Sequence, residues 1–221
     1  MELEPDVARI RWKNTCRLVP SRYPATGILD RITNPRDLPL IFELESWTND
    51  RISGELGVLN HIPAEEWVAG PQASVIMAAF CHPRPDGGRF NGPERGAWYA
   101  GRKLETAQAE IAWHRTAELA EVGVFETRVQ MRLYLADFSA AFHDLRAEVL
   151  SSSSYRETQE VAARLLSVGS NGVLYRSVRE AARGECVACF RPKLVANVRP
   201  GPHFEYRWHG SRTPSILKLG T

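Results

Sequence analysis

The loop 86–91, Asp-Gly-Gly-Arg-Phe-Asn, has residue types that suit the binding of a phosphate. Gly87 and Gly88 let the backbone approach a ligand closely. Arg89 supplies a planar guanidinium that can donate two hydrogen bonds to one phosphate group. The loop therefore predicts a site for an anionic ligand.

The stretch 104–122 is rich in Ala, Glu and Leu and predicts a helix. Thr106, Glu110 and His114 recur in it at four-residue intervals and project from one face. A lone glutamate on a helix is most often solvated surface. The Arg-bearing loop that precedes this helix weakens that interpretation and makes Glu110 a candidate functional residue.

Other common site motifs are absent from the sequence. The six histidines form no HxH or HExxH spacing, so we expect no metal site, and neither a GxxxxGK[ST] loop nor a GxSxG motif occurs. Cys186 and Cys189 form a single CxxC in a predicted strand, where residues three apart point to opposite faces. Two buried structural cysteines are the better interpretation than a zinc or redox site.

Several sequence blocks, in order, resemble the RES domain family. Gly87-Gly88-Arg89-Phe90-Asn91 resembles its Gly-rich loop, with Phe where the family usually has Trp. The resemblance spans about Arg17 to Pro192, and its other blocks are 15–20, 98–100, 105–110, 172–179 and 185–192.

This resemblance implies an α+β fold with an ADP-ribosyltransferase-like mixed β-sheet core, flanking helices and a single domain. It implies a bacterial toxin of a toxin–antitoxin module that degrades NAD by cleaving the nicotinamide–ribose glycosidic bond, as a glycohydrolase or phosphorylase. NAD is then the substrate, and the reaction requires no metal. The implied partner is a helix-turn-helix antitoxin that covers the active site. Dimers occur in the family, but the sequence does not determine whether this chain forms a homodimer.

The resemblance also implies roles for individual residues, carried over by position. A carboxylate such as Glu110 would stabilise the positive charge that develops on the ribose, and arginines would bind the pyrophosphate. Arg22 and Arg31 compete with Arg17, and the serine run 151–154 competes with Ser177. The implied catalytic residues are Glu110, Arg17 and Ser177, and the implied NAD-binding residues are Arg89, Tyr99, Gly88, Arg17 and His114.

The elements that must position these residues follow from apolar patterning and from Pro and Gly breaks. Their irregular order indicates an α+β fold and not a doubly wound sheet. A serine of the run 151–154 is expected to cap the helix that follows it. Strands are predicted at 10–19, 98–100, 125–135, 172–175, 185–191 and 204–208, helices at 38–59, 104–122 and 157–166, and a strand or a turn of helix at 73–80.

A length of 221 residues fits one domain. We expect a single RES-type domain over 1–221, with a core at about 15–192. A helical insertion at about 30–80 and a C-terminal extension at 193–221 account for the extra length.

The net charge of +2 hides an asymmetry, because 171–221 has nine basic and three acidic residues. One alternative function is therefore a nucleic-acid-binding module that uses this segment, with Phe204, Tyr206 and Trp208 between its charges. The near balance of the whole chain argues against it, and no direct nucleic-acid contact is expected. Another alternative is an ADP-ribosyltransferase that modifies a cellular protein. A catalytically dead relative is a third, which the intact site residues disfavour.

No apolar run approaches the roughly 18–20 residues of a membrane helix. The acidic N-terminus has no apolar segment typical of a secretory signal, and four cysteines are too few for a disulfide scaffold. We therefore expect a cytoplasmic protein.

Overall fold

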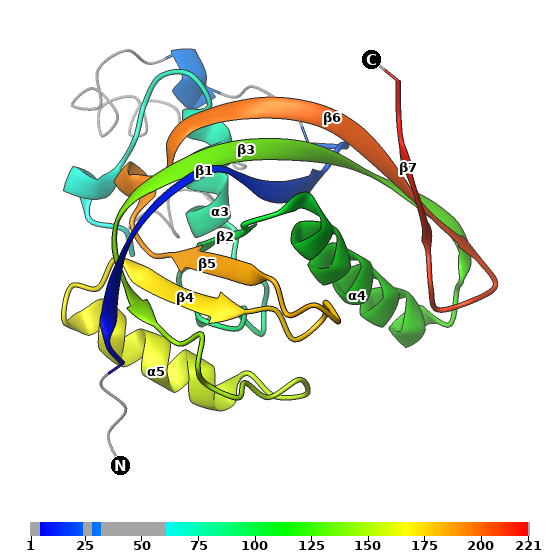
Figure 1. The fold of residues 1–221 in the computed structure, drawn as a ribbon. Coiled ribbons are helices and arrows are strands. Elements are labelled where there is room, and N and C mark those ends of the chain that lie inside the picture. Colours follow the sequence, from blue (N-terminus) through cyan, green and yellow to red (C-terminus); the bar gives the residue numbers. More distant parts are fainter. Residues whose placement is uncertain (1–4, 24–27, 32–60, 221) are drawn as a thin grey trace.

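The fold consists of one seven-stranded sheet with helices on its faces, as the ribbon of the computed structural model shows (Figure 1). The structure describes residues 5–23, 28–31 and 61–220. Within these ranges the helices are α3 (Ala73–Cys81), α4 (Leu104–Val122) and α5 (Arg156–Ser167), with short 3₁₀ turns at Ile28–Arg31, Ala64–Glu66 and Pro192–Leu194. The strands are β1 (Val7–Pro20), β2 (Trp98–Gly101), β3 (Glu126–Asp144), β4 (Gly172–Arg176), β5 (Glu185–Cys189), β6 (Ala196–His209) and β7 (Ser215–Lys218).

The strands are ordered β1-β2-β5-β4-β3-β6-β7, and β1 also pairs with β3. The β1–β3 ladder runs antiparallel from Val7 opposite His143 to Pro20 opposite Met131, whereas β3 and β4 are parallel. The expected α+β fold with a mixed sheet is confirmed. Because β1 pairs with β2 on one edge and with β3 on the other, the strands β1, β2, β5, β4 and β3 close into a ring. Strands β6 and β7 extend the sheet beyond β3.

Strand β3 is longer than the predicted 125–135, and both of its faces are covered. Its first half alternates as expected, with Met131 and Leu133 buried beside α4. Further along, Tyr134 and Phe138 on the opposite face are buried in the core between β3 and β2. A strand buried on both faces lacks the simple alternation that marks a half-exposed one, so the pattern underestimated its length.

Helix α4 has the predicted bounds and lies under the arch of β1, β3 and β6 (Figure 1). Ala107 packs there against Leu18 and Met131. Helix α5 covers the face of β4 and β5 through Ala162 and Leu165. The packing of Ala107 places the N-terminal half of α4 beside the sheet, where its polar face borders a pocket.

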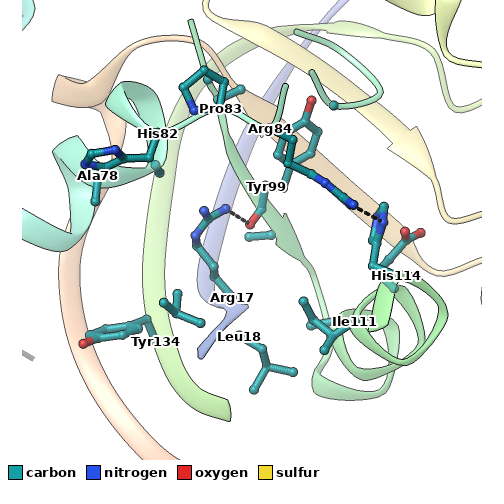
Figure 2. Close-up of a pocket in the computed structure, with 18 of the residues that line it drawn as sticks. Arg17, Leu18, Ala78, His82, Pro83, Arg84, Tyr99, Ile111, His114 and Tyr134 are labelled. Atoms are coloured by element: carbon teal, nitrogen blue, oxygen red, sulfur yellow. Dashed lines mark hydrogen bonds between the residues drawn. The ribbon is translucent and has the colours of Figure 1, made fainter. Parts of the chain in front are cut away.

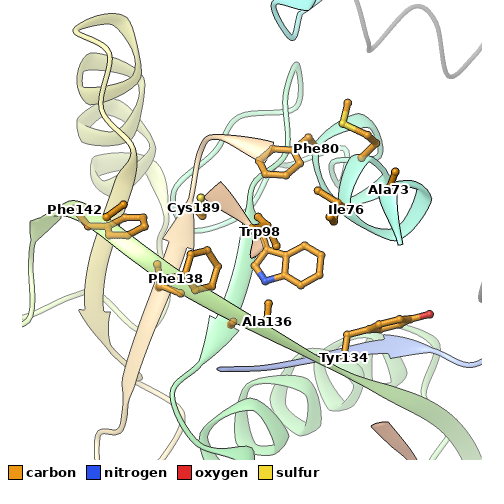
Figure 3. Close-up of a cluster of buried hydrophobic side chains, with 14 of the residues drawn as sticks. Ala73, Ile76, Phe80, Trp98, Tyr134, Ala136, Phe138, Phe142 and Cys189 are labelled. Atoms are coloured by element: carbon orange, nitrogen blue, oxygen red, sulfur yellow. The ribbon is translucent and has the colours of Figure 1, made fainter. Parts of the chain in front are cut away.

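The segment 73–80 is helical, and α3 closes one end of the core. Ile76 and Phe80 pack toward Trp98 of β2 and the aromatic side chains of β3 (Figure 3). The predicted helix 38–59, and most of the predicted insertion 30–80, lie outside the described residues.

The two cysteines of the CxxC motif lie on opposite faces of β5. Cys186 packs with Tyr175 under α5, whereas Cys189 packs with Trp98 in the core (Figure 3). Both are free and buried, and burial raises the pKa of the Cys189 thiol to about 12. The prediction of two buried thiols that point apart is confirmed.

The basic segment 171–221 contributes four strands of the sheet, β4 to β7. β6 pairs with β3 from Glu126 opposite His209 to Asp137 opposite Ala196. Phe204, Tyr206 and Trp208 are buried against α4. These aromatic rings therefore belong to the core and are not a platform on which nucleic-acid bases stack.

Candidate active site

A pocket of about 1100 Å³ opens between α4, the Gly-rich loop, β1, β3 and α3 (Figure 2). It is lined by all but one of the residues to which the family resemblance assigns a role. The exception, Ser177, is fully buried and bonds Glu110. The predicted residues that line the pocket are Arg17, Gly88, Arg89, Tyr99, Glu110 and His114.

Glu110 is held at the pocket wall by a hydroxyl from a distant part of the chain. The Oγ of Ser177 donates a hydrogen bond of 2.6 Å to Oε1 of Glu110. Burial raises the pKa of the Glu110 carboxyl, and the Ser177 bond and the charges of Arg89 and Arg179 oppose that rise. These opposing groups support the ionised form that burial disfavours.

The orientation of the Ser177 hydroxyl follows from its other contacts. Its oxygen accepts the backbone N–H groups of Arg179 and Glu180, each at 3.1 Å. Those two bonds occupy the acceptor positions of the oxygen, so its proton is directed at Glu110. Ser177 acts on the site through that carboxylate.

Arg89 is 6% exposed, yet part of its guanidinium has no partner. Its Nη1 donates to the carbonyl of Ser151 at 2.7 Å, and its Cζ lies 4.6 Å from the ring centre of Tyr155. The buried Nη2 has no hydrogen-bond partner among the described residues. Leaving a buried charged donor unpaired is costly, so this nitrogen is a ready site for an anionic ligand.

Arg17 lies on β1 in the middle of the pocket (Figure 2). Its Nη1 donates to the carbonyl of Tyr99 at 3.2 Å, and its guanidinium lies over Trp98. The buried Nε has no hydrogen-bond partner within the described ranges. Burial lowers the pKa of Arg17 to about 10, so it remains a cation at neutral pH.

The competing arginines are placed differently. Arg22 stacks on Tyr23 and is outside the pocket lining, and the side chain of Arg31 is outside the described residues.

Tyr99 ties the Gly-rich loop to β2. Its hydroxyl donates to Oδ1 of Asn91 at 2.7 Å and accepts the N–H of Phe90 at 2.8 Å. Gln159 of α5 donates to the carbonyl of Gly88 at 2.9 Å. The loop is thus held from both sides, with Gly88 facing the pocket.

Replacing Gly88 with alanine should disrupt this loop, because the new Cβ would lie 2.8 Å from Oη of Tyr99 and 2.5 Å from Oδ1 of Asn91. We expect a loss of about 1–3 kcal/mol in the free energy of unfolding, measured in urea. Gly92→Ala is the matched control, because its Cβ would meet only the side chain of Glu94. Equal stability of the two variants would contradict the tight packing of Gly88.

His114 is neutral at physiological pH. Nη1 of Arg84 donates to its Nδ1 at 3.1 Å, across the pocket (Figure 2). Burial, and then the charge of Arg84, lower the pKa of His114 to about 4. An imidazole held in this form can accept or donate hydrogen bonds, but it does not act as a cationic acid.

Two arginines near the site had no assigned role from the sequence. Arg84 bridges His114 and Glu118, the latter at 3.2 Å. Arg179 lies 3.3 Å from the ring centre of Trp113 and donates to the carbonyl of Ser152 at 2.6 Å. The position of Arg179, two residues after Ser177, is the sequence feature that could have indicated a role in the site. The direction of its side chain, however, depends on the fold of the loop between β4 and β5.

The serine run 151–154 is exposed, and none of its side chains lines the pocket. The run contributes to the site through its backbone. The carbonyls of Ser151 and Ser152 accept hydrogen bonds from Arg89 and Arg179. The N-cap position itself is occupied by Tyr155, which makes no side-chain cap. A serine of the run nevertheless bonds the start of the helix as expected, because Ser154 Oγ accepts the backbone N–H of Arg156, the first residue of α5, at 3.4 Å. Ser151 Oγ accepts two backbone N–H groups within the run.

Taken together, the site places guanidinium nitrogens that lack a hydrogen-bond partner within the described ranges near the half-buried carboxylate of Glu110. That combination suits a substrate with an anionic group and a centre that becomes positive during reaction. In the described part of the chain, no cluster of His, Cys, Asp or Glu could hold a metal ion. Across the same residues, no helix has the length and apolarity of a membrane span.

Comparison with known proteins adds three findings. The model of the RES domain matches residues 59–209. Uncharacterized protein y4oC of Sinorhizobium fredii (strain NBRC 101917 / NGR234) is 26% identical over 200 residues, which are 89% of this chain and 83% of that protein. The crystal structure of the M. tuberculosis MbcT–MbcA toxin–antitoxin complex aligns with a TM-score of 0.48 and 16% identity, covering 90% of this chain and 87% of that one.

Proposed function

The chain belongs to the RES domain family, and from this premise we propose that it is an NAD-degrading toxin that cleaves the nicotinamide–ribose bond. The observation that carries the proposal is the half-buried Glu110 carboxylate, held by Ser177 beside arginine nitrogens that have no hydrogen-bond partner among the described residues. NAD has the matching chemistry, with an anionic pyrophosphate and a cationic nicotinamide leaving group.

In the proposed reaction, Arg17 and Arg89 bind the pyrophosphate through charge-assisted hydrogen bonds. Departure of nicotinamide builds oxocarbenium character on the ribose, as in glycoside hydrolysis. The ionised Glu110 stabilises that charge from its half-buried position, where electrostatic interactions are stronger than in bulk water. Ser177 positions the carboxylate, and water or phosphate accepts the ADP-ribose.

The test is to follow nicotinamide release from NAD by the purified protein, with and without phosphate. No release would contradict the proposal. Transfer of label from [³²P]NAD to cellular protein would instead identify an ADP-ribosyltransferase. The proposed partner is a cognate antitoxin that binds over the pocket, and restored growth on its co-expression with a growth-arresting toxin would support that partner.

Replacing Ser177 with alanine should shift the pH dependence of the reaction. The Ser177 hydrogen bond lowers the pKa of Glu110, so its loss raises that pKa further and makes the ionised form predominate only at higher pH. We expect the acidic limb of the kcat/KM profile to move to higher pH, with kcat/KM at neutral pH about tenfold lower.

Ser153→Ala is the control, because that serine is exposed and outside the pocket lining. A Ser177→Ala profile that is lower at every pH without a displaced limb would mean that Ser177 does not act through the ionisation of Glu110.

A further inference from the structure

Arg84 lies in the loop after α3 and reaches across the pocket to α4 (Figure 2). Its Nη1 bonds Nδ1 of His114 at 3.1 Å, and its Nη2 pairs with Oε1 of Glu118 at 3.2 Å. His114 and Glu118 are four residues apart on α4, so one face of the helix presents both of them to the guanidinium. Pro83 and Pro85 flank Arg84 and restrict its backbone.

The contact with Arg84 determines which ring nitrogen of His114 carries a proton. A guanidinium has no acceptor, so Arg84 donates this hydrogen bond and Nδ1 accepts it through its lone pair. A neutral imidazole with a lone pair at Nδ1 carries its single proton on Nε2. Among the described residues, Nε2 of His114 has no hydrogen-bond partner, and the side chain lines the pocket. Its N–H is therefore available to a bound substrate.

We propose that Arg84 is a positioning residue, which holds His114 as a hydrogen-bond donor and prevents it from acting as a general base. This role rests on the proposed function, in which the acceptor is a carbonyl or hydroxyl oxygen of the dinucleotide. The one lone pair of the neutral ring is bonded to Arg84, so the ring has no nitrogen that can take a proton from the attacking nucleophile. Glu110, one turn earlier on α4, keeps its role opposite the positive charge of the ribose.

The electrostatic surroundings of His114 favour the same neutral state. The charged groups around it come from α4 and three loops, and they are Arg84, Arg89, Arg179, Arg115, Glu110 and Glu118. Both carboxylates already bond other groups, Glu118 the guanidinium of Arg84 and Glu110 the hydroxyl of Ser177. Burial, followed by the charges of the four arginines, lowers the pKa of His114 to about 4. The ring is thus neutral at physiological pH, and its Nδ1 lone pair remains available to Arg84.

The nitrogen NMR spectrum of the purified protein tests the tautomer without any reaction. We expect His114, assigned by the loss of its signals in His114→Gln, to show an unprotonated Nδ1 and a protonated Nε2 between about pH 5.5 and 8. Arg84→Met keeps the length of the side chain but has neither donor nor charge, so His114 should titrate at a higher pH in that variant.

Two further variants complete this measurement. Arg84→Lys keeps a donor and a positive charge and should restore the spectrum of the wild type. Arg164→Met, at an exposed position of α5, is the matched control and should leave the spectrum unchanged. A protonated Nδ1 in the wild type, or the same titration of His114 in the wild type and in Arg84→Met, would overturn the positioning role.

Substitutions of His114 test its role as a donor. Glutamine places an amide N–H near the position of Nε2 but has no basic nitrogen, whereas alanine has neither. We expect kcat/KM for nicotinamide release to fall about fivefold or more in His114→Ala, and His114→Gln to recover most of that loss. Equal losses in the two variants would overturn the donor role, because both of them remove a general base.

The NMR result keeps this inference separate from the proposed reaction. If the wild type releases no nicotinamide but His114 has the expected tautomer, the proposed function fails and the positioning role of Arg84 stands. Calorimetric titration of NAD then decides the donor role, since affinity should be weaker in His114→Ala than in His114→Gln. Equal affinities, or absence of NAD binding to the wild type, would contradict that role.

Discussion

Replacing Glu110 with glutamine should lower kcat for nicotinamide release from NAD by about a hundredfold or more. Glutamine has a similar size and can still accept the hydrogen bond of Ser177, but it cannot carry the negative charge that stabilises the ribose cation. Nicotinamide release at saturating NAD measures the effect. Glu121→Gln, at an exposed position of the same helix, is the control. An unchanged kcat would remove Glu110 from the reaction.

The same variant should be more stable than the wild type at neutral pH. Burial raises the pKa of Glu110 in the folded state, so ionisation of this group opposes folding. That cost is absent below the unfolded pKa, grows as pH rises through the interval up to the folded pKa, and is complete above it. Urea unfolding should therefore show a gain for Glu110→Gln at neutral pH that disappears in acid. A loss of activity with a gain of stability separates lost chemistry from a lost fold.

Replacing Arg89 with lysine should raise KM for NAD by about tenfold or more. Lysine keeps the charge, but a single ammonium cannot reproduce a guanidinium that bonds the carbonyl of Ser151 and keeps a second nitrogen without a partner among the described residues. It also lacks the planar group that lies over Tyr155. Initial rates over a range of NAD concentrations measure the effect.

The control for this variant is Arg164→Lys, at an exposed position of α5. Because Arg89 is proposed to bind the pyrophosphate in both the ground state and the transition state, KM should change more than kcat. If KM equals that of the wild type, the buried nitrogen without a partner does not contact the substrate.

Local patterns were reliable where one short segment determines the outcome. The bounds of α4 were predicted from composition and periodicity, and the divergence of Cys186 and Cys189 followed from the two-residue period of a strand. The expected bond from a serine to the start of α5 forms between Ser154 Oγ and the N–H of Arg156, although Tyr155 occupies the N-cap position itself. The length of β3 was underestimated because elements on both of its faces bury it.

The site residues also fall into two groups, those that local sequence indicated and those that only the fold brings together. The spacing of Glu110 and His114 on one helix face, and of Arg89 after two glycines, is local and was visible in the sequence. The order of the sequence blocks indicated the family, which the match over 59–209 confirms. The resemblance proposed Ser177, but its spacing gave no way to choose between it and the run 151–154. The hydrogen bond to Glu110 spans 67 positions, and only the packing of the β4–β5 loop against α4 forms it.

The sequence by itself therefore determined the family, the helix that carries the carboxylate and the loop that carries an arginine, because each depends on residues close together in the chain. Tertiary structure alone decided that Ser177 directs its proton at Glu110, that backbone carbonyls of 151–152 hold two arginines, and that α3 and β3 line the pocket together with α4. The physical reason is that these contacts join segments whose proximity is set by closure of the sheet and burial of its core. The periodicity of apolar residues encodes neither the closure of the sheet nor the burial of its core.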